Sequence, residues 1–117
     1  KAGRYGELFY SEELGADRLL LQLPDSQELL RFAGQTLGQV IEYDRENHTE
    51  LLSTLAAYCA NNRNIVETAR NLHTHQNTIR YRLERVNELL SESISKSESW
   101  FNIELAIRIL RLYRQIS

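Results

Sequence analysis

Residues 62–90 read NRNIVETARNLHTHQNTIRYRLERVNELL, and the spacing of apolar side chains in this stretch decides the predicted fold. In its second half the apolar residues recur at i, i+4, i+7 and i+11, which is one face of a helix. They are Ile79, Leu83, Val86 and Leu90. In the first half, Asn64 precedes Glu67 by three residues, the spacing of a capping box that begins a helix. We therefore expect two helices joined by a tight turn, a helix-turn-helix over residues 64–90.

The junction between the two helices has the residues that such a motif needs. Where the second helix crosses the first, a small side chain is required, and Ala69 supplies it. The turn falls four residues later, at His73. Glycine is usual there because the backbone is left-handed, and histidine is one of the side chains that tolerates this conformation.

The outward face of the second helix is polar, and its charge changes from the start of the helix to its end. At about 100° per residue, Asn77, Thr78, Tyr81 and Arg85 lie opposite the apolar stripe. Acidic residues occur only in the later turns. Because the N-terminal end of a recognition helix enters the major groove of DNA, this gradient indicates that the start of the helix reads bases.

The side chains at this start have the chemistry of base and phosphate recognition. Arginine suits guanine, and asparagine or glutamine suits adenine, while arginine also reaches phosphates on either side. The residues predicted to contact DNA are Thr74, His75, Gln76, Asn77, Thr78, Arg80, Tyr81, Arg82 and Arg85. The alternative is a solvated amphipathic helix whose arginines occur by chance.

Charge is distributed unevenly along the chain. The formal net charge is −2, but residues 1–50 hold five Lys/Arg against ten Asp/Glu, whereas residues 51–90 hold five against three. Local charge near phosphates matters more than the sum. A length of 117 residues with 42% hydrophobic residues suits one soluble domain.

Several other classes of protein are disfavoured. No apolar run approaches the ~20 residues of a membrane span, and no signal peptide opens the chain. The single Cys59 excludes an internal disulfide and fits the cytoplasm. His73 and His75 are explained better as a turn residue and a helix cap than as metal ligands. We expect no metal, no cofactor and no enzyme activity. Because no methionine opens the chain, we also expect it to be a piece of a longer protein.

The flanking segments give weaker signals. Residues 6–10 are a possible strand, and the leucine run 19–23 is either a helical turn or a buried strand that must be covered. A helix is expected to start near Asp25, and Gly38 to end or kink it. A polar link over 44–48 should precede a helix that ends at Asn61-Asn62.

The C-terminal part should be a loop followed by a helix. Five serines in residues 91–99 predict a loop. Residues 100–116 predict an amphipathic helix with Trp100 as an anchor in the core and Phe101 on its apolar stripe. The predicted fold class is mainly α, a helical bundle containing a helix-turn-helix, with at most two short N-terminal strands.

Residues 72–86, LHTHQNTIRYRLERV, closely resemble the C-terminal helix-turn-helix of PucR/CdaR-type bacterial transcriptional regulators. The likeness extends to Glu42-Tyr43-Asp44 and to Glu104-Leu105-Ala106-Ile107-Arg108. It implies that residues 1–24 are the tail of an upstream cyclase-like regulatory domain and that residues 25–117 are a DNA-binding domain. One departure is Gln76, where the family often has arginine.

The resemblance implies a sequence-specific DNA-binding domain of a metabolite-responsive regulator. Its expected partners are double-stranded DNA and a second copy of the chain, with a small-molecule effector bound by upstream domains and no membrane. The alternative is a helical protein-interaction or dimerisation module that does not bind DNA.

Overall fold

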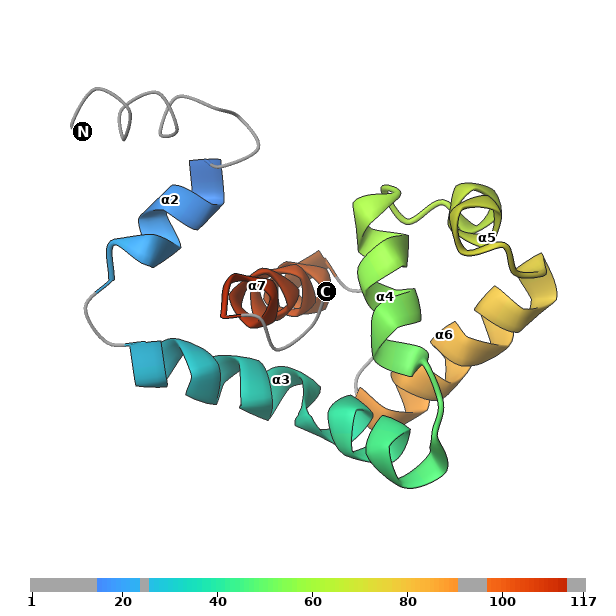
Figure 1. Cartoon of the computed structure of the whole chain (residues 1–117), viewed down its shortest axis with the longest axis horizontal. Helices are drawn as coiled ribbons and strands as arrows, with labels where there is room; N and C mark the ends of the chain where they lie inside the picture. Colours follow the sequence, from blue (N-terminus) through green and yellow to red (C-terminus); the bar gives the residue numbers. More distant parts are fainter. Residues whose placement is uncertain (1–14, 24–25, 91–96, 114–117) are drawn as a thin grey trace.

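The computed structural model describes residues 15–23, 26–90 and 97–113. Within these ranges there are six helices and no strand, so the mainly α prediction is confirmed (Figure 1). The helices are α2 (Gly15–Leu21), α3 (Ser26–Asn47), α4 (Leu51–Ala60), α5 (Ile65–Leu72), α6 (Gln76–Leu90) and α7 (Ser97–Leu112). The strand predicted over residues 6–10 lies outside the described residues.

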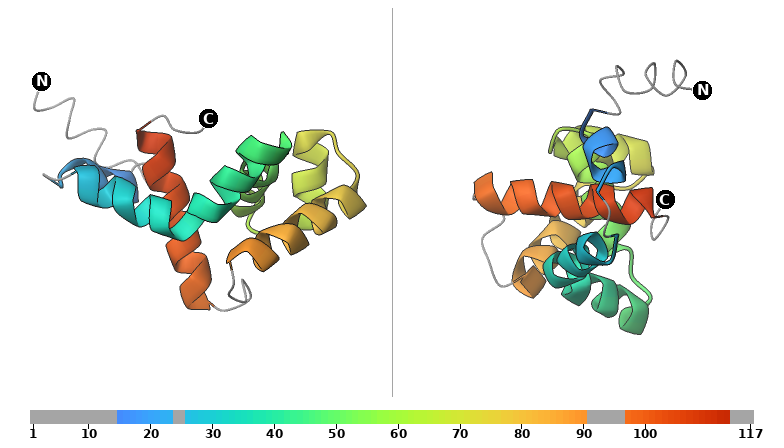
Figure 2. Two further views of the ribbon diagram at one scale, coloured as in Figure 1. Left: turned by 90° about the horizontal axis from the view of Figure 1, so that it is seen from below. Right: turned by 90° about the vertical axis from the view of Figure 1, so that its left-hand side faces the viewer.

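The helices form two connected groups. Helices α4, α5 and α6 pack on one another, while α7 packs against α3 and crosses it (Figure 2). Helix α3 also contacts α4 and α6, and so joins the two groups. Helix α2 lies against α7, where Arg108 is 3.4 Å from Asp17. The helix-turn-helix is therefore one side of a bundle and not an isolated motif.

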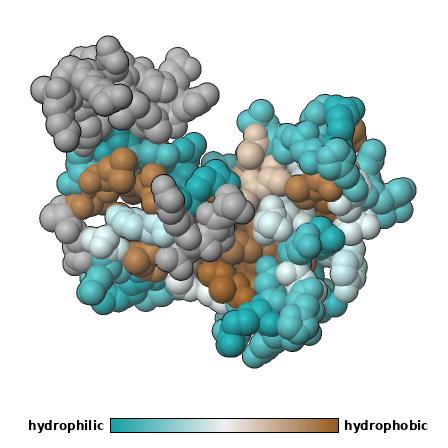
Figure 3. All heavy atoms as spheres, viewed as in Figure 1, coloured by the Kyte–Doolittle hydropathy of each residue, from teal (hydrophilic) through white to brown (hydrophobic). Residues whose placement is uncertain are grey.

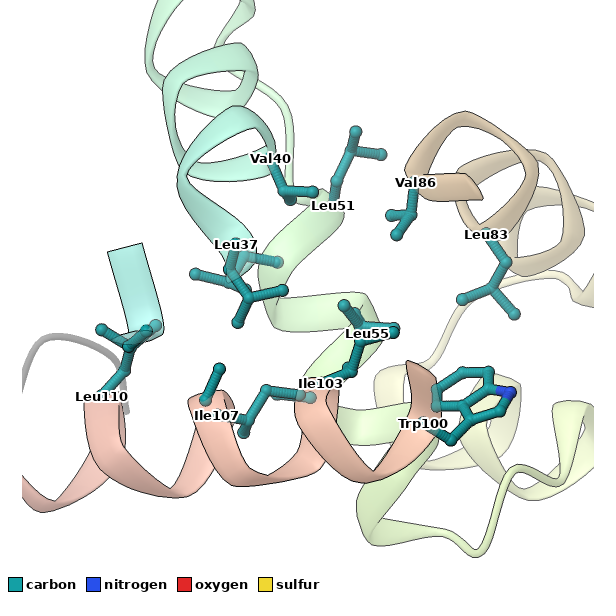
Figure 4. Close-up of a cluster of buried hydrophobic side chains, with 14 of the residues drawn as sticks. Leu37, Val40, Leu51, Leu55, Leu83, Val86, Trp100, Ile103, Ile107 and Leu110 are labelled. Atoms are coloured by element: carbon teal, nitrogen blue, oxygen red, sulfur yellow. The ribbon is translucent and has the colours of Figure 1, made fainter. Parts of the chain in front are cut away.

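The core lies where α3, α4, α6 and α7 meet (Figure 4). Each helix contributes side chains that are almost completely buried. They include Leu37 and Val40 from α3, Leu55 from α4, Ile79 and Val86 from α6, and Ile109 from α7. Burying a side chain of this size stabilises the fold by about 1.5–3 kcal/mol. The apolar face of α6 that the sequence predicted is thus the face that attaches α6 to the bundle.

Helix α3 does not end at Gly38 but continues to Asn47, and its axis bends along the way (Figure 2). A glycine inside a helix costs about 1 kcal/mol relative to alanine. Here Leu37 and Val40 on either side are both fully buried, and their packing outweighs that cost. The polar link predicted over 44–48 was therefore wrong for most of its length, because residues 44–47 are the last turn of α3.

The leucine run 19–23 is helical up to Leu21, but most of it is not covered by other described residues. Leu20 is buried, whereas Leu19, Leu21 and Leu23 are 60%, 56% and 50% exposed. A helix of seven residues turns only one narrow face towards α7. The prediction that the run must be covered was therefore wrong for these three leucines, and Figure 3 shows a hydrophobic patch over α2.

Helix α7 begins earlier than predicted, because residues 97–99 of the predicted serine loop belong to it. Trp100 is 7% exposed and its ring lies 5.7 Å from that of Tyr58, which confirms it as an anchor. Phe101 is 67% exposed, so its assignment to the apolar stripe was wrong. It lies about 100° from Trp100 around the helix, and that rotation takes it out of the core. No helix in the described part of the chain is long and apolar enough to cross a membrane.

Candidate DNA-binding site

Helix α5 starts at the residue that the sequence predicted. The Oδ1 atom of Asn64 accepts from the backbone N–H of Glu67 at 2.9 Å, which is an N-cap bond. The reciprocal half of the capping box is not formed. The Glu67 carboxylate instead accepts from Arg70 at 2.6 Å, and the Asn64 N–H donates to the carbonyl of Asn61. The start of α5 is therefore fixed by the asparagine alone.

The turn between α5 and α6 has the predicted left-handed residue. His73 has φ 53° and ψ 44°. Its N–H donates to the Arg70 carbonyl, and the next N–H, of Thr74, donates to the Ala69 carbonyl at 2.9 Å. Ala69 is 5% exposed, as expected of a residue at a helix crossing. The Thr74 hydroxyl donates to the Leu72 carbonyl, so this side chain supports the turn.

His75 caps the start of α6. Its Nδ1 atom accepts from the backbone N–H of Asn77 at 3.0 Å, which confirms the prediction that this histidine is a helix cap. A neutral imidazole that accepts at Nδ1 carries its hydrogen on Nε2. That second nitrogen is then a donor at the exposed end of the helix. Gln76 and Thr78, which follow, are half-buried.

Asn77 and Arg80 form an exposed polar pair on the first turns of α6. Arg80 donates from Nη1 to Oδ1 of Asn77 at 3.2 Å. The first turn of α6 contains no acidic residue, and Tyr81 is 58% exposed beside the pair. The amide nitrogen of Asn77 and the other guanidinium nitrogens are left with donors for a ligand. These are the predicted groups that the structure places most clearly at the surface.

Arg82 is oriented differently. Its Nη1 donates to the hydroxyl of Thr54 on α4 at 2.9 Å, and Thr54 is fully buried. The Thr54 hydroxyl in turn donates to the Glu50 carbonyl. Arg82 is therefore half-buried at the joint between α4 and α6, on the side away from the Asn77–Arg80 pair.

Arg85 is held among aromatic rings. Its guanidinium carbon lies 5.7 Å from the ring centroids of both Tyr43 on α3 and Tyr81. It also donates to the Tyr81 hydroxyl at 3.1 Å and is 3.3 Å from Glu88. The Tyr81 bond, with the charges around it, raises the pKa of Arg85 above its ordinary value. Cation–π contacts of this kind favour one orientation of the side chain.

Sequence reasoning missed two residues of α5. The apolar residues Ile65 and Val66 at the start of this helix predict that Val66 faces inward, but Val66 is 45% exposed, so that prediction is wrong. The inward residues next to it are Thr68 and Ala69. Val66 shares with Arg70 and His73 the spacing i, i+4, i+7, which is one helical face. That spacing was the available signal, and this face lines an open groove with the start of α6.

The described residues were also predicted to offer no metal site, and their one cysteine is Cys59. Among the described residues, no group of three or more His, Cys, Asp and Glu lies close enough to hold a metal ion. Burial raises the pKa of the Cys59 thiol to about 12, and the nearby Glu104 adds to the shift. A thiol with so high a pKa is a poor nucleophile at neutral pH.

Comparison with known proteins shows the family to which this chain is similar. Residues 51–109, from α4 into α7, match the PucR C-terminal helix-turn-helix domain. The chain is 39% identical over 93 residues to a purine catabolism regulatory protein of Bacillus subtilis, covering 80% of this chain and 17% of that protein. It is 30% identical over 99 residues to the proline-responsive transcriptional activator PutR of the same organism, covering 85% and 24%.

A third relative, the DNA-binding transcriptional activator AdeR of Bacillus subtilis, is 26% identical over 102 residues, covering 87% of this chain and 24% of that protein. The chain thus spans about a quarter or less of the length of these relatives. No solved structure matches it. The named relatives in this comparison are transcriptional regulators, and the range matched to the family contains the α5–α6 unit. The chain therefore belongs to the PucR C-terminal helix-turn-helix family and is a DNA-binding domain of the regulator type.

Proposed function

We propose that this domain binds a specific duplex sequence by placing the start of α6 in the major groove. The observation that carries the proposal is the exposed Asn77–Arg80 pair, at 3.2 Å, on a helix whose first turn holds no acidic residue. An amide and a guanidinium side by side suit adjacent adenine and guanine edges. Figure 3 shows a mainly hydrophilic surface over α5 and α6, as a DNA-facing side requires.

The contacts of each side chain suggest a division of roles. His75, Gln76, Asn77, Arg80 and Tyr81 are the candidates for base and phosphate contacts at the reading end. Thr74 and Thr78 lie half-buried at the same end, and the Thr74 hydroxyl donates to the Leu72 carbonyl in the turn.

Arg82 and Arg85 have a different role in this proposal. Arg82 is bound to Thr54, and Arg85 lies against Tyr43 and Tyr81. We assign both to positioning α6 on the bundle. For Arg82 this role replaces the phosphate contact that the sequence predicted, and for Arg85 that contact is secondary to it.

The larger protein is proposed from its relatives. One relative is named for purine catabolism and another for its response to proline. We propose that this domain belongs to a longer, cytoplasmic, non-enzymatic regulator whose upstream domains bind a small metabolite, with residues 1–24 leading into them. Two copies would bind a symmetric site, because dimeric helix-turn-helix proteins match their two-fold axis to the operator.

The proposal is tested by selecting bound sequences from random duplexes and measuring affinity for the best duplex against salt concentration. We expect log K to fall linearly with log salt, by about 0.9 for each phosphate contacted. Arg80→Ala and Asn77→Ala should each weaken binding by about 5- to 100-fold.

A matched control is Arg31→Ala, which removes an exposed arginine of α3 that is also paired within its own helix, with Glu28. It should leave the affinity unchanged. Sedimentation of the complex should give two chains per duplex. Selection that enriches no sequence, or equal losses for Arg80→Ala and Arg31→Ala, would overturn the proposal.

A further inference from the structure

The face of α5 that carries Val66 forms one wall of an open groove, and the turn and the start of α6 form the other. The groove has a volume of about 420 Å³. It is lined by Val66, Ala69 and Arg70 of α5, by Gln76 at the start of α6, and by the turn residues His73, Thr74 and His75 between the two helices. The groove is therefore continuous with the reading end described above.

Val66 is unusual among the apolar residues of the helix-turn-helix. It is 45% exposed, whereas Ala69 on the same helix and Ile79 on the next are 5% and 0% exposed. A ligand that covers an exposed apolar side chain removes it from water, and this makes the free energy of binding more favourable. The groove thus offers an apolar contact at one point on an otherwise polar surface.

Arg70 lies one turn after Val66 on the same wall. Its guanidinium is 2.6 Å from the Glu67 carboxylate, and both side chains are largely exposed. An exposed pair of this kind contributes little to stability. The pair therefore keeps Arg70 beside the groove. Because breaking the pair loses little stability, a phosphate can replace the Glu67 carboxylate as the partner of Arg70.

Duplex DNA offers one group that matches Val66. On the major-groove edges of the bases the 5-methyl of thymine is the apolar group, and short apolar side chains contact it. A phosphate of the backbone beside that base would face Arg70. Apolar contact and positive charge in one groove, next to the base-reading residues, fit this combination.

We propose that Val66 reads a thymine methyl at the edge of the bound sequence while Arg70 contacts the neighbouring phosphate. Helix α5 is then a second reading element and not only a support for α6. This inference rests on the proposed DNA binding and names a specificity residue within it.

The test uses the full 117-residue chain and its best selected duplex. Each thymine is replaced in turn by deoxyuridine, which lacks only the 5-methyl. For the unaltered chain we expect one replacement in each half-site to weaken binding about fourfold, the effect of exposing one methyl-sized group. Val66→Ala should weaken binding to the unmodified duplex similarly and should lose all sensitivity to that one replacement.

Two controls separate this result from general effects. Leu21→Ala shortens a leucine of α2 that is 56% exposed, and should keep the full response to deoxyuridine. Arg70→Ala should lower the salt slope by about 0.9 for each bound chain, whereas Arg31→Ala should not. Thermal unfolding should confirm that Val66→Ala and Arg70→Ala fold, since both residues are exposed.

The outcomes distinguish the two proposals. If the unaltered chain binds a selected duplex but Val66→Ala keeps every deoxyuridine response, the reading role of Val66 is wrong. A uniform loss with no response removed means that Val66 touches only the sugar–phosphate backbone, which also overturns it. If the unaltered chain binds no duplex, the proposed function itself fails, and this inference fails with it.

Discussion

The Nη1 atom of Arg82 donates to the hydroxyl of Thr54 at 2.9 Å, and this bond joins the recognition helix to α4 across 28 positions of sequence. Thr54 is completely buried, and its hydroxyl also donates to the Glu50 carbonyl at 2.8 Å. A guanidinium that would otherwise extend towards DNA is thus attached to the interior of the bundle. The bond adds to the packing of the buried apolar face of α6, which turns Asn77 and Arg80 outward.

Arg82→Ala should therefore destabilise the fold without removing a phosphate contact. We expect a loss of about 1.5–3 kcal/mol in the free energy of unfolding, the usual contribution of a hydrogen bond to a charged group. The slope of log K against log salt should stay within experimental error of that of the unaltered chain. Urea unfolding and salt-dependent DNA titration measure the two quantities.

Thr54→Val is the matched control, because it removes the acceptor and leaves the arginine in place. It should destabilise the fold to a similar extent, and the double variant should lose less than the sum of the two single losses. A salt slope lowered by about 0.9 for each bound chain in Arg82→Ala alone would show instead that Arg82 contacts a phosphate.

The helix-turn-helix was predictable because its signals are local. The cap at Asn64, the left-handed turn at His73 and the apolar spacing of Ile79, Leu83 and Val86 each depend on residues within a few positions. The structure confirms all of them. Signals of this kind determine the local backbone structure and do not depend on distant parts of the chain.

The orientation of single side chains was not predictable in the same way. Phe101 and Val66 are apolar, but each lies at the margin of a helical face, and only the position of the neighbouring helix decides whether it is covered. The Arg82–Thr54 bond requires the packing angle of α4 on α6, which no spacing within α6 contains. The leucines of α2 show the same limit, since Leu20 alone faces α7.

Gln76 is the position where this chain departs from the arginine often found in the family. It is half-buried at the start of α6, on the wall of the groove shared with Val66. Gln76→Arg should tighten DNA binding and steepen the salt slope by about 0.9 for each bound chain, because each copy gains one cation next to the phosphates. Titrations at several salt concentrations measure this change.

The control for that substitution is Gln22→Arg, which adds the same charge at an exposed position just after α2. It should leave the slope unchanged, because exposed charges further apart than about 10 Å are screened at 0.1 M salt. Equal steepening by both variants would mean that net charge, and not the position of residue 76, is responsible.

Asp44 caps a helix to which it does not belong. From the last turn of α3 its two carboxylate oxygens accept from the N–H groups of Leu51 and Leu52, each at 2.8 Å, and one also accepts from the Thr49 hydroxyl at 2.5 Å. Asp44→Ala should lower the free energy of unfolding by about 1–2 kcal/mol, as for loss of an N-cap. Urea unfolding measures it.

Glu50 provides the comparison for Asp44. It occupies the N-cap position of α4 but makes no side-chain capping bond. Glu50→Ala should therefore change stability by less than about 0.5 kcal/mol. If the two substitutions have the same effect, the start of α4 does not depend on the carboxylate from α3.

Cys59 should report the folded state through its ionisation. Burial raises its pKa to about 12 in the folded chain, whereas an unfolded cysteine has a pKa of about 8.5. Below pH 8.5 the thiol is protonated in both states and stability does not depend on it. Above that value the unfolded chain loses the proton first, so the free energy of unfolding should fall by up to about 1.4 kcal/mol per pH unit until the folded pKa is reached.

Other groups also titrate in that range, so the measurement is a difference between the unaltered chain and Cys59→Ala. Urea unfolding of both from pH 7 to pH 10.5 should give curves that are parallel below about pH 8.5 and converge or cross above it. A thiol reagent at pH 8 should modify the native thiol far more slowly than the unfolded one, since the thiolate is the reactive form. If the two curves of unfolding free energy are parallel throughout and the native thiol is modified rapidly, Cys59 is solvated in the folded chain. The packing of α4 against α7 near Glu104 would then be looser than in the structure.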